Sequence, residues 1–224
     1  MAKKKWKFEN GYSDELVPEL AGFDRLTRRL LFNRNVFKKE DADKFFSPDY
    51  VRDLGDPLAI KGMEKACARV LEAIEKKEKI IIHGDYDADG VSSSTMLADF
   101  FRKIDFRNFE VYIPDRFKEG YGLTSKSLDY IFEKKASLVI TIDNGISNYE
   151  EISRAEKNGV NVVVIDHHIV PEKVPPACAV VDLWQEGETY PFRDFCGSGI
   201  AFKFISAMLL KHSFGLPLGW EKRL

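Results

Sequence analysis

Three short polar clusters in the sequence carry residue types that bind divalent metal ions. Each directly follows an apolar run, and together they hold three of the four histidines: residues 83–90 (His-Gly-Asp-Tyr-Asp-Ala-Asp-Gly), 143–145 (Asp-Asn-Gly) and 166–168 (Asp-His-His). Carboxylate oxygens with imidazole nitrogens suit Mn²⁺, Mg²⁺ or Zn²⁺, and the lack of thiolates in the clusters argues against a structural zinc. Because neighbouring carboxylates raise one another's pKa unless a cation neutralises them, a rich ligand set with a shared aspartate indicates two ions.

The apolar runs before these clusters are typical of buried strands. Residues 80–82, 138–142 and 162–165 precede the clusters, and residues 109–113 and 179–181 have a similar character. Strands that alternate with helices, and that are apolar throughout, predict an α/β fold with a parallel sheet of about five strands flanked by helices. Because such sheets place their sites beyond the carboxyl ends of the strands, we expect the three clusters to meet at one edge.

Helices are expected between these strands. Apolar residues recur at helical spacing over residues 63–74, and Thr124 is a candidate N-cap for the helix that follows it. Ser147 and Glu150 have the spacing of a capping box, and a last helix is expected over about residues 199–210.

Composition and charge limit the classes of protein to consider. The 224 residues carry a formal net charge of −2, so any surface that binds a polyanion must be local. The three cysteines are scattered, which favours a reducing compartment over a disulfide framework. No apolar run is long enough to span a bilayer, and the N-terminus lacks the apolar run of a signal peptide. We therefore predict a cytoplasmic protein without membrane partners, with a short helical N-terminal segment (residues 1–57) and a main domain (residues 58–224).

Each cluster taken alone also has a simpler interpretation. Residues 87–90 fit a loop that starts a helix about as well as they fit a metal site, and residues 143–145 make a good turn. Two adjacent histidines at the end of a strand can serve as hydrogen-bonding residues. The combination of all three clusters favours metal chemistry.

In chain order, His83-x-x-x-Asp87-x-Asp89, Asp143-Asn144-Gly145 and Asp166-His167-His168 resemble the signature of the DHH family of phosphoesterases. Within that family the chain is most similar to the RecJ-like exonucleases, over about residues 15–210. The segments that carry this likeness are residues 46–63, 84–90, 114–123, 141–147 and 196–202.

The resemblance implies a role for each matched residue. The residues expected at two Mn²⁺ or Mg²⁺ ions are His83, Asp87, Asp89, Asp143, His167 and His168, all but His83 also expected to be catalytic. Asp143 would bridge the ions, and His168 would be a ligand or a contact to the scissile phosphate. The residues expected to support the ligands are Asp85, Asn144 and Asp166. Those expected to contact nucleic acid or phosphate are Ser92, Arg116, Tyr121 and Gly145, although simple capping suits Ser92 and a solvated loop suits Arg116 and Tyr121.

The resemblance also implies an activity: metal-dependent 5′-to-3′ exonuclease digestion of single-stranded DNA to 5′-mononucleotides, in DNA repair and recombination. Single-stranded DNA is the expected partner, and single-strand-binding or other repair proteins are candidates. The alternatives are a phosphatase of pyrophosphate or short oligonucleotides and a non-catalytic DHH scaffold. The family's last metal-binding aspartate and its DHH-associated domain have no counterpart before Leu224, so we expect a truncated catalytic core.

Overall fold

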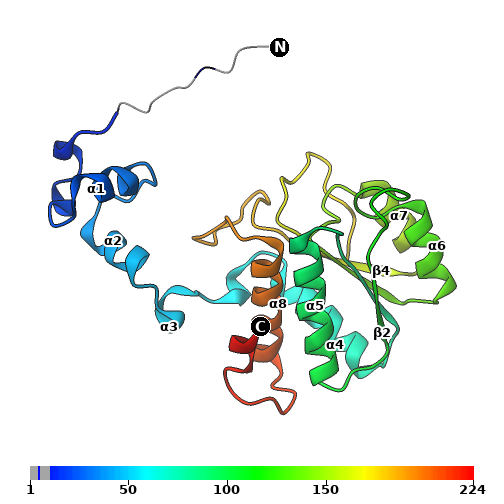
Figure 1. Cartoon of the computed structure of the whole chain (residues 1–224). Helices are drawn as coiled ribbons and strands as arrows, with labels where there is room; N and C mark the ends of the chain where they lie inside the picture. Colours follow the sequence, from blue (N-terminus) through cyan, green and yellow to red (C-terminus); the bar gives the residue numbers. More distant parts are fainter. Residues whose placement is uncertain (1–4, 6–10) are drawn as a thin grey trace. The chain divides into compact units, whose positions relative to one another are not determined.

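The computed structural model describes residue 5 and residues 11–224, and the chain divides into two compact units, Met1–Gly55 and Asp56–Leu224 (Figure 1). The start of the expected N-terminal segment therefore lies outside the described residues. The division falls close to the boundary expected after residue 57, where the helical segment gives way to the larger unit.

The first unit is built from short helices, as predicted. They are the 3-10 helices η1 (Asp14–Leu16) and η2 (Pro18–Leu20) and the α-helices α1 (Arg25–Phe32), α2 (Lys39–Phe46) and α3 (Tyr50–Asp53). Asp24 caps α1, because its Oδ1 accepts hydrogen bonds from the backbone N–H groups of Leu26 and Thr27. Val17, Leu20, Leu31 and Ala42 are buried together and give this unit a small core.

In the described residues of the second unit, five strands form one parallel sheet in the spatial order β2-β1-β3-β4-β5. The strands are β1 (Ile80–His83), β2 (Phe109–Tyr112), β3 (Leu138–Ile142), β4 (Asn161–Ile165) and β5 (Ala179–Val181). The predicted α/β fold with about five parallel strands is therefore confirmed.

Helices cover both faces of this sheet (Figure 1). They are α4 (Met63–Glu75), α5 (Ala88–Lys103), α6 (Ser125–Glu133), α7 (Tyr149–Lys157) and α8 (Gly197–Lys211), with the short helices η3 (Pro57–Ala59) and η4 (Trp220–Arg223) beside them. Helices α4, α5 and α8 pack on one face, and α6 and α7 pack on the other. Across residues 11–224, no helix combines the length and apolar character needed to cross a membrane.

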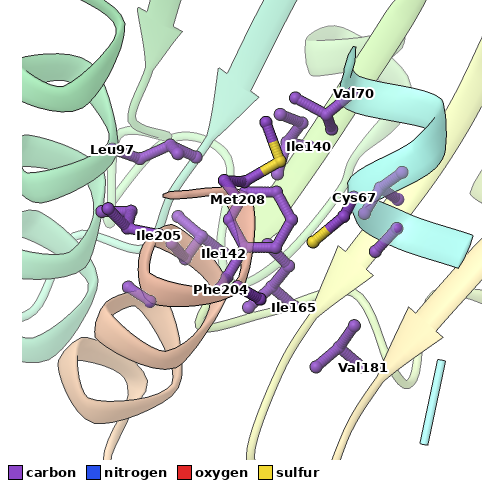
Figure 2. Close-up of a cluster of buried hydrophobic side chains, with 14 of the residues drawn as sticks. Cys67, Val70, Leu97, Ile140, Ile142, Ile165, Val181, Phe204, Ile205 and Met208 are labelled. Carbon is purple, nitrogen blue, oxygen red and sulfur yellow. The ribbon is translucent and has the colours of Figure 1, made fainter. Parts of the chain in front are cut away.

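The strands are apolar throughout because both of their faces are buried. Ile80 and Ile82 point into the core under α4, α5 and α8, whereas Ile81 between them points into the core under α6 and α7. Figure 2 shows the larger core, in which Phe204 and Met208 of α8 lie against side chains of β3 and β4. This two-sided burial fixes the carboxyl ends of the strands, where the polar clusters begin.

Two predicted helix caps had different outcomes. Thr124 caps α6 as predicted, with its Oγ1 accepting from the Ser127 N–H in a capping box. The predicted box of Ser147 and Glu150 was wrong, because Asn148 occupies the N-cap of α7. The Asn148 amide bonds instead to both backbone groups of Leu123, 3.1 Å in each case, and so ties α7 to the loop before α6.

Candidate metal centre

The three polar clusters lie at the carboxyl ends of three neighbouring strands, β1, β3 and β4. His83 at the end of β1 is level with Thr141 of β3, and Ile142 of β3 is level with Ile165 of β4. The loops that follow therefore leave the sheet side by side, as the sequence predicts.

One group of carboxylates gathers around the end of β1. Asp85, Asp87 and Asp143 each offer an oxygen atom, and these atoms all lie within 4.8 Å of one another. Asp85 and Asp143 are buried, whereas Asp87 is exposed. Asp87 is also the N-cap of α5, because its Oδ1 accepts from the N–H groups of Asp89 and Gly90 at 2.9 Å. The turn interpretation and the metal interpretation of this cluster are thus compatible.

A second group shares Asp143 with the first. Asp143, His167 and His168 offer atoms that also lie within 4.8 Å of one another, and His167 Nε2 is 2.9 Å from Asp143 Oδ1. Burial raises the pKa of Asp143, and the hydrogen bond with Asp143 raises the pKa of His167. Asp143 has a left-handed backbone with φ of 62°, a conformation that costs about 1–3 kcal/mol at a non-glycine residue. Strain of this kind, at the residue common to both groups, is typical of a functional site.

Asp166 and Tyr121 hold His168 from two sides. His168 Nδ1 is 2.7 Å from Asp166 Oδ1, and this bond raises the pKa of His168 to about 9. Asp166 Oδ2 accepts from the Ile146 N–H at 2.9 Å, so both of its oxygens are used. The Tyr121 hydroxyl donates to the Asp143 carbonyl at 3.1 Å and lies 3.3 Å from His168 Nδ1.

His83 lies outside both groups of the described residues. It is fully buried, its ring stacks on Tyr112 with centroids 5.5 Å apart, and its Nδ1 is 3.2 Å from Asn144 Oδ1. The Asn144 amide donates to the carbonyls of His83 and Ile142 and so joins the ends of β1 and β3. Burial lowers the pKa of His83 to about 4, so the ring is neutral. Its Nε2 has no hydrogen-bond partner among the described residues.

Asp89 also lies outside both groups and is held by the start of α8. Its carboxylate accepts from the Gly197 N–H at 2.5 Å and from the N–H and hydroxyl of Ser198 at 2.8 and 2.6 Å. Burial opposes these bonds, but together they leave the pKa of Asp89 lowered. Asp89 Oδ2 is still 3.7 Å from His167 Nε2, and a Cβ added to Gly197 would lie 2.7 Å from Asp143 Oδ1. The start of α8 therefore borders the centre.

The other expected nucleic-acid contacts surround the centre less closely. Ser92 is exposed on α5, where its hydroxyl donates to the Ala88 carbonyl at 2.6 Å, so it is not a cap. The Arg116 guanidinium lies over the Tyr86 ring, 5.3 Å from its centre. Gly145 is buried with φ of 108°, and an added Cβ would lie 2.3 Å from the Thr141 hydroxyl. The backbone conformation and the close approach of Thr141 therefore require glycine at position 145, independently of any contact with nucleic acid.

The sequence analysis missed one acidic residue at this edge. Asp182 directly follows β5 and neighbours Asp166, whose N–H donates to the Val181 carbonyl at 3.0 Å. Asp182 is fully buried, and burial raises its pKa to about 7. Its Oδ1 accepts from the Trp184 N–H, but its Oδ2 has no partner among the described residues. The signal was present, because Asp182 follows an apolar run as the other clusters do.

The donor set of this centre fits divalent cations. Oxygen and imidazole ligands suit Mn²⁺ and Mg²⁺, and the described ion pairs here involve histidines rather than lysine or arginine. Asp85 belongs to the first of these groups, and its Oδ1 is buried without a hydrogen-bond partner among the described residues. Close carboxylates that lack a cationic neighbour are stabilised when a metal ion binds between them.

Comparison with known families gives one match, described as the N-terminal domain of the DHH family, over residues 79–218. The match covers more than half of the chain and includes all three polar clusters.

Individual relatives agree with this match. The single-stranded-DNA-specific exonuclease RecJ of Bacillus subtilis is 37% identical over 210 residues, which cover 93% of this chain and 26% of the relative. A crystal structure of exonuclease RecJ bound to manganese aligns with a TM-score of 0.64 and 32% identity, over 71% of this chain and 40% of that one. RecJ of Thermus thermophilus in complex with Mn²⁺ aligns with a TM-score of 0.64 and 28% identity, over 84% of this chain and 25% of that one. This chain therefore spans about a quarter of the length of the Bacillus relative.

Proposed function

The chain belongs to the DHH family, and from that premise we propose that it is the catalytic core of a metal-dependent exonuclease that digests single-stranded DNA. The relatives are named as single-stranded-DNA-specific exonucleases, and two solved relatives are manganese complexes. The 5′-to-3′ polarity, the release of 5′-mononucleotides and the role in repair and recombination follow from the resemblance to RecJ-like exonucleases.

The observation that carries this proposal is the position of Asp143. It belongs to both groups of potential ligands, one with Asp85 and Asp87 and one with His167 and His168. A carboxylate shared in this way suits two Mn²⁺ or Mg²⁺ ions, with Asp143 between them. Such ions, when bound, would stabilise the negative charge that develops on the phosphoryl oxygens during hydrolysis.

The remaining residues would position the substrate around these ions. His168, whose Nδ1 is engaged by Asp166, would present its Nε2 to a phosphate oxygen. Tyr121 would fix His168 and the Asp143 backbone through its hydroxyl while its ring remains half exposed beside the DNA. Arg116, held over Tyr86, would contact the DNA backbone or stack on a base. The expected phosphate contact near Ser92 is not part of this proposal, because Asp87 already accepts from the Asp89 and Gly90 N–H groups at the start of α5.

We place the protein in the cytoplasm, with single-stranded DNA as its partner and single-strand-binding or other repair proteins as candidates. The cysteines Cys67, Cys178 and Cys196 are free thiols in the structure, which agrees with a reducing compartment.

The test is release of mononucleotides from labelled single-stranded DNA in the presence of Mn²⁺. Asp143→Asn is expected to reduce the rate by at least about 100-fold, because even residues that only support a metal ligand contribute about 10–100-fold. Asp129→Asn is the matched control. Asp129 is an exposed residue of α6 that forms an ion pair with Arg154 of α7. Release of orthophosphate from pyrophosphate with the DNA left intact would favour the small-substrate phosphatase instead, and equal rates for both variants would contradict the assigned centre.

A further inference from the structure

The start of helix α8 binds the carboxylate of Asp89, a residue at the start of α5 that lies 108 positions earlier in the chain. The first N–H groups of an α-helix have no partner within the helix. At the N-cap of α8, the side chain of Cys196 accepts no hydrogen bond. Asp89 takes its place, because it accepts from the Gly197 N–H at 2.5 Å and from the Ser198 N–H at 2.8 Å. A side chain of α5 therefore caps α8.

The Ser198 side chain adds a third hydrogen bond to this carboxylate. Its hydroxyl donates to Asp89 Oδ1 at 2.6 Å, and its N–H donates to the same oxygen. Because a carboxylate oxygen has about two lone pairs, Ser198 occupies Oδ1 with both of its donors. Among the described residues, Asp89 Oδ2 accepts a hydrogen bond from the Gly197 N–H only, so it keeps the capacity for another partner. Ser198 thus determines which oxygen of Asp89 stays available.

The available oxygen lies beside the ligand group of Asp143, His167 and His168. Asp89 Oδ2 is 3.7 Å from His167 Nε2, which is itself 2.9 Å from Asp143 Oδ1. A Cβ added to Gly197 would lie 2.7 Å from Asp143 Oδ1, so the start of α8 is packed directly against the shared carboxylate. The hydrogen bonds from α8 therefore hold Asp89 next to a group of metal-binding side chains.

Helix capping alone does not account for the hydroxyl bond. The N–H groups of Gly197 and Ser198 need an acceptor because they begin a helix, whereas a hydroxyl can rotate toward another acceptor. Ser206, further along α8, shows a usual alternative, since its hydroxyl donates to the Phe202 carbonyl at 2.8 Å. At position 198 the hydroxyl instead gives one carboxylate a third donor. Three donors to a charged acceptor restrain its orientation more strongly than a cap requires.

We propose that Ser198 is a positioning residue for Asp89, and that it holds Oδ1 so that Oδ2 faces the ion bound by His167. This inference rests on the proposed function, in which Asp89 is expected at the metal ions. It adds to the centre a residue that lies outside the three polar clusters and that contacts Asp89 rather than the ion. Helix α8 would then contribute to metal binding without supplying a ligand.

The test is a Mn²⁺ titration of the protein without substrate, in which electron paramagnetic resonance measures the free ion. Ser198→Ala removes the hydroxyl but keeps the N–H, so α8 retains both backbone bonds of its cap. This variant is expected to weaken one Mn²⁺ site by about 10-fold, the lower end of the range for residues that support a metal ligand. Ser198→Thr restores the hydroxyl, and its affinity is expected to lie within about 3-fold of the unmodified protein.

The matched control is Ser206→Ala, which removes a hydroxyl from the same helix at a similarly half-buried position. Its Mn²⁺ affinity is expected to stay within about 3-fold of the unmodified protein, below the smallest loss typical of a ligand-supporting residue. Equal weakening by the two alanine variants would overturn the proposal. So would normal affinity in Ser198→Ala, or a loss in Ser198→Thr as large as that in Ser198→Ala.

A combination with Asp89→Ala shows whether Ser198 acts through Asp89. In that background Ser198→Ala is expected to weaken Mn²⁺ binding by less than about 3-fold more, because the carboxylate that the hydroxyl positions is gone. If the full loss is added instead, Ser198 acts on the ion by another route and the proposal is wrong.

Failure of this proposal is distinct from failure of the proposed function. If Asp143→Asn and Asp89→Ala weaken Mn²⁺ binding while Ser198→Ala does not, the centre stands and Ser198 does not position Asp89. If Asp143→Asn weakens binding but Asp89→Ala does not, the centre stands without Asp89 and this proposal is wrong. If the unmodified protein binds no Mn²⁺, both proposals are wrong.

Discussion

The buried neutral imidazole of His83 should make the metal-free protein lose stability in mild acid. The unfolded chain takes up a proton on this residue near pH 6.5, whereas burial lowers the pKa in the folded protein to about 4. Below pH 6.5 the unfolded state therefore binds the extra proton, and the free energy of unfolding falls until about pH 4. At about 1.4 kcal/mol for each pKa unit, the total loss is about 3 kcal/mol, of which about 2 kcal/mol falls between pH 7 and pH 5.

Urea unfolding of the metal-free protein at several pH values between 7 and 5 measures this loss. The carboxylates and the other histidines titrate as well, so the informative quantity is the difference from His83→Gln, which keeps an amide toward Asn144 but cannot be protonated. The gap between the two free energies of unfolding is expected to change by about 2 kcal/mol across that range, with the unmodified protein losing more. Parallel curves would show that His83 is not held neutral by burial, and the placement of its ring against Tyr112 would then be wrong.

Two further substitutions test the geometry around Asp143. Gly145→Ala would place an alanine at a φ of 108° and its Cβ 2.3 Å from the Thr141 hydroxyl. Urea unfolding should therefore show that the free energy of unfolding falls by at least about 2 kcal/mol. Gly159→Ala has a similar positive φ and open space, so its loss should stay near about 1 kcal/mol, and equal losses would rule out the clash. Tyr121→Phe removes the hydroxyl bonded to Asp143 and should slow digestion of single-stranded DNA by about 3–10-fold, the value of one hydrogen bond, whereas an unchanged rate would exclude a positioning role.

The strands and the place of the metal centre could be predicted because both depend on local patterns. The run at residues 138–142 is apolar at every position but one and is bounded by polar residues, and β3 occupies the same span. A parallel sheet then brings the carboxyl ends of its strands together. The convergence of the clusters at Asp87, Asp143 and His167 needs no further information than this topology.

The helix starts were less predictable because distant residues decide them. Helix α8 begins at Gly197 rather than near residue 199, and its first N–H groups are satisfied by Asp89, a residue 108 positions earlier in the chain. The cap of α7 was misplaced for a similar reason, since Asn148 is committed to Leu123. Patterns within a few residues carry no information about such partners.

The surroundings of His83 and Asp85 could not be predicted from the sequence, because they depend on how the loop after β1 packs. In the structure the Asp85 backbone lies close to Gly90 of α5, and the His83 ring stacks on Tyr112. The left-handed backbone of Asp143 cannot be predicted from residue spacing either.

Buried carboxylates at this edge of the sheet differ in whether their oxygens have hydrogen-bond partners. Asp166 is also buried, yet its oxygens accept from the Ile146 and His167 N–H groups and from the His168 ring. Asp85 and Asp182, equally buried, each keep one oxygen without a partner among the described residues. A sheet that places acids after neighbouring strands concentrates negative charge, and hydrogen bonds neutralise only part of it. The negative charge that remains requires a cation. The unpartnered buried carboxylates that destabilise the metal-free protein are therefore the groups that would favour metal binding.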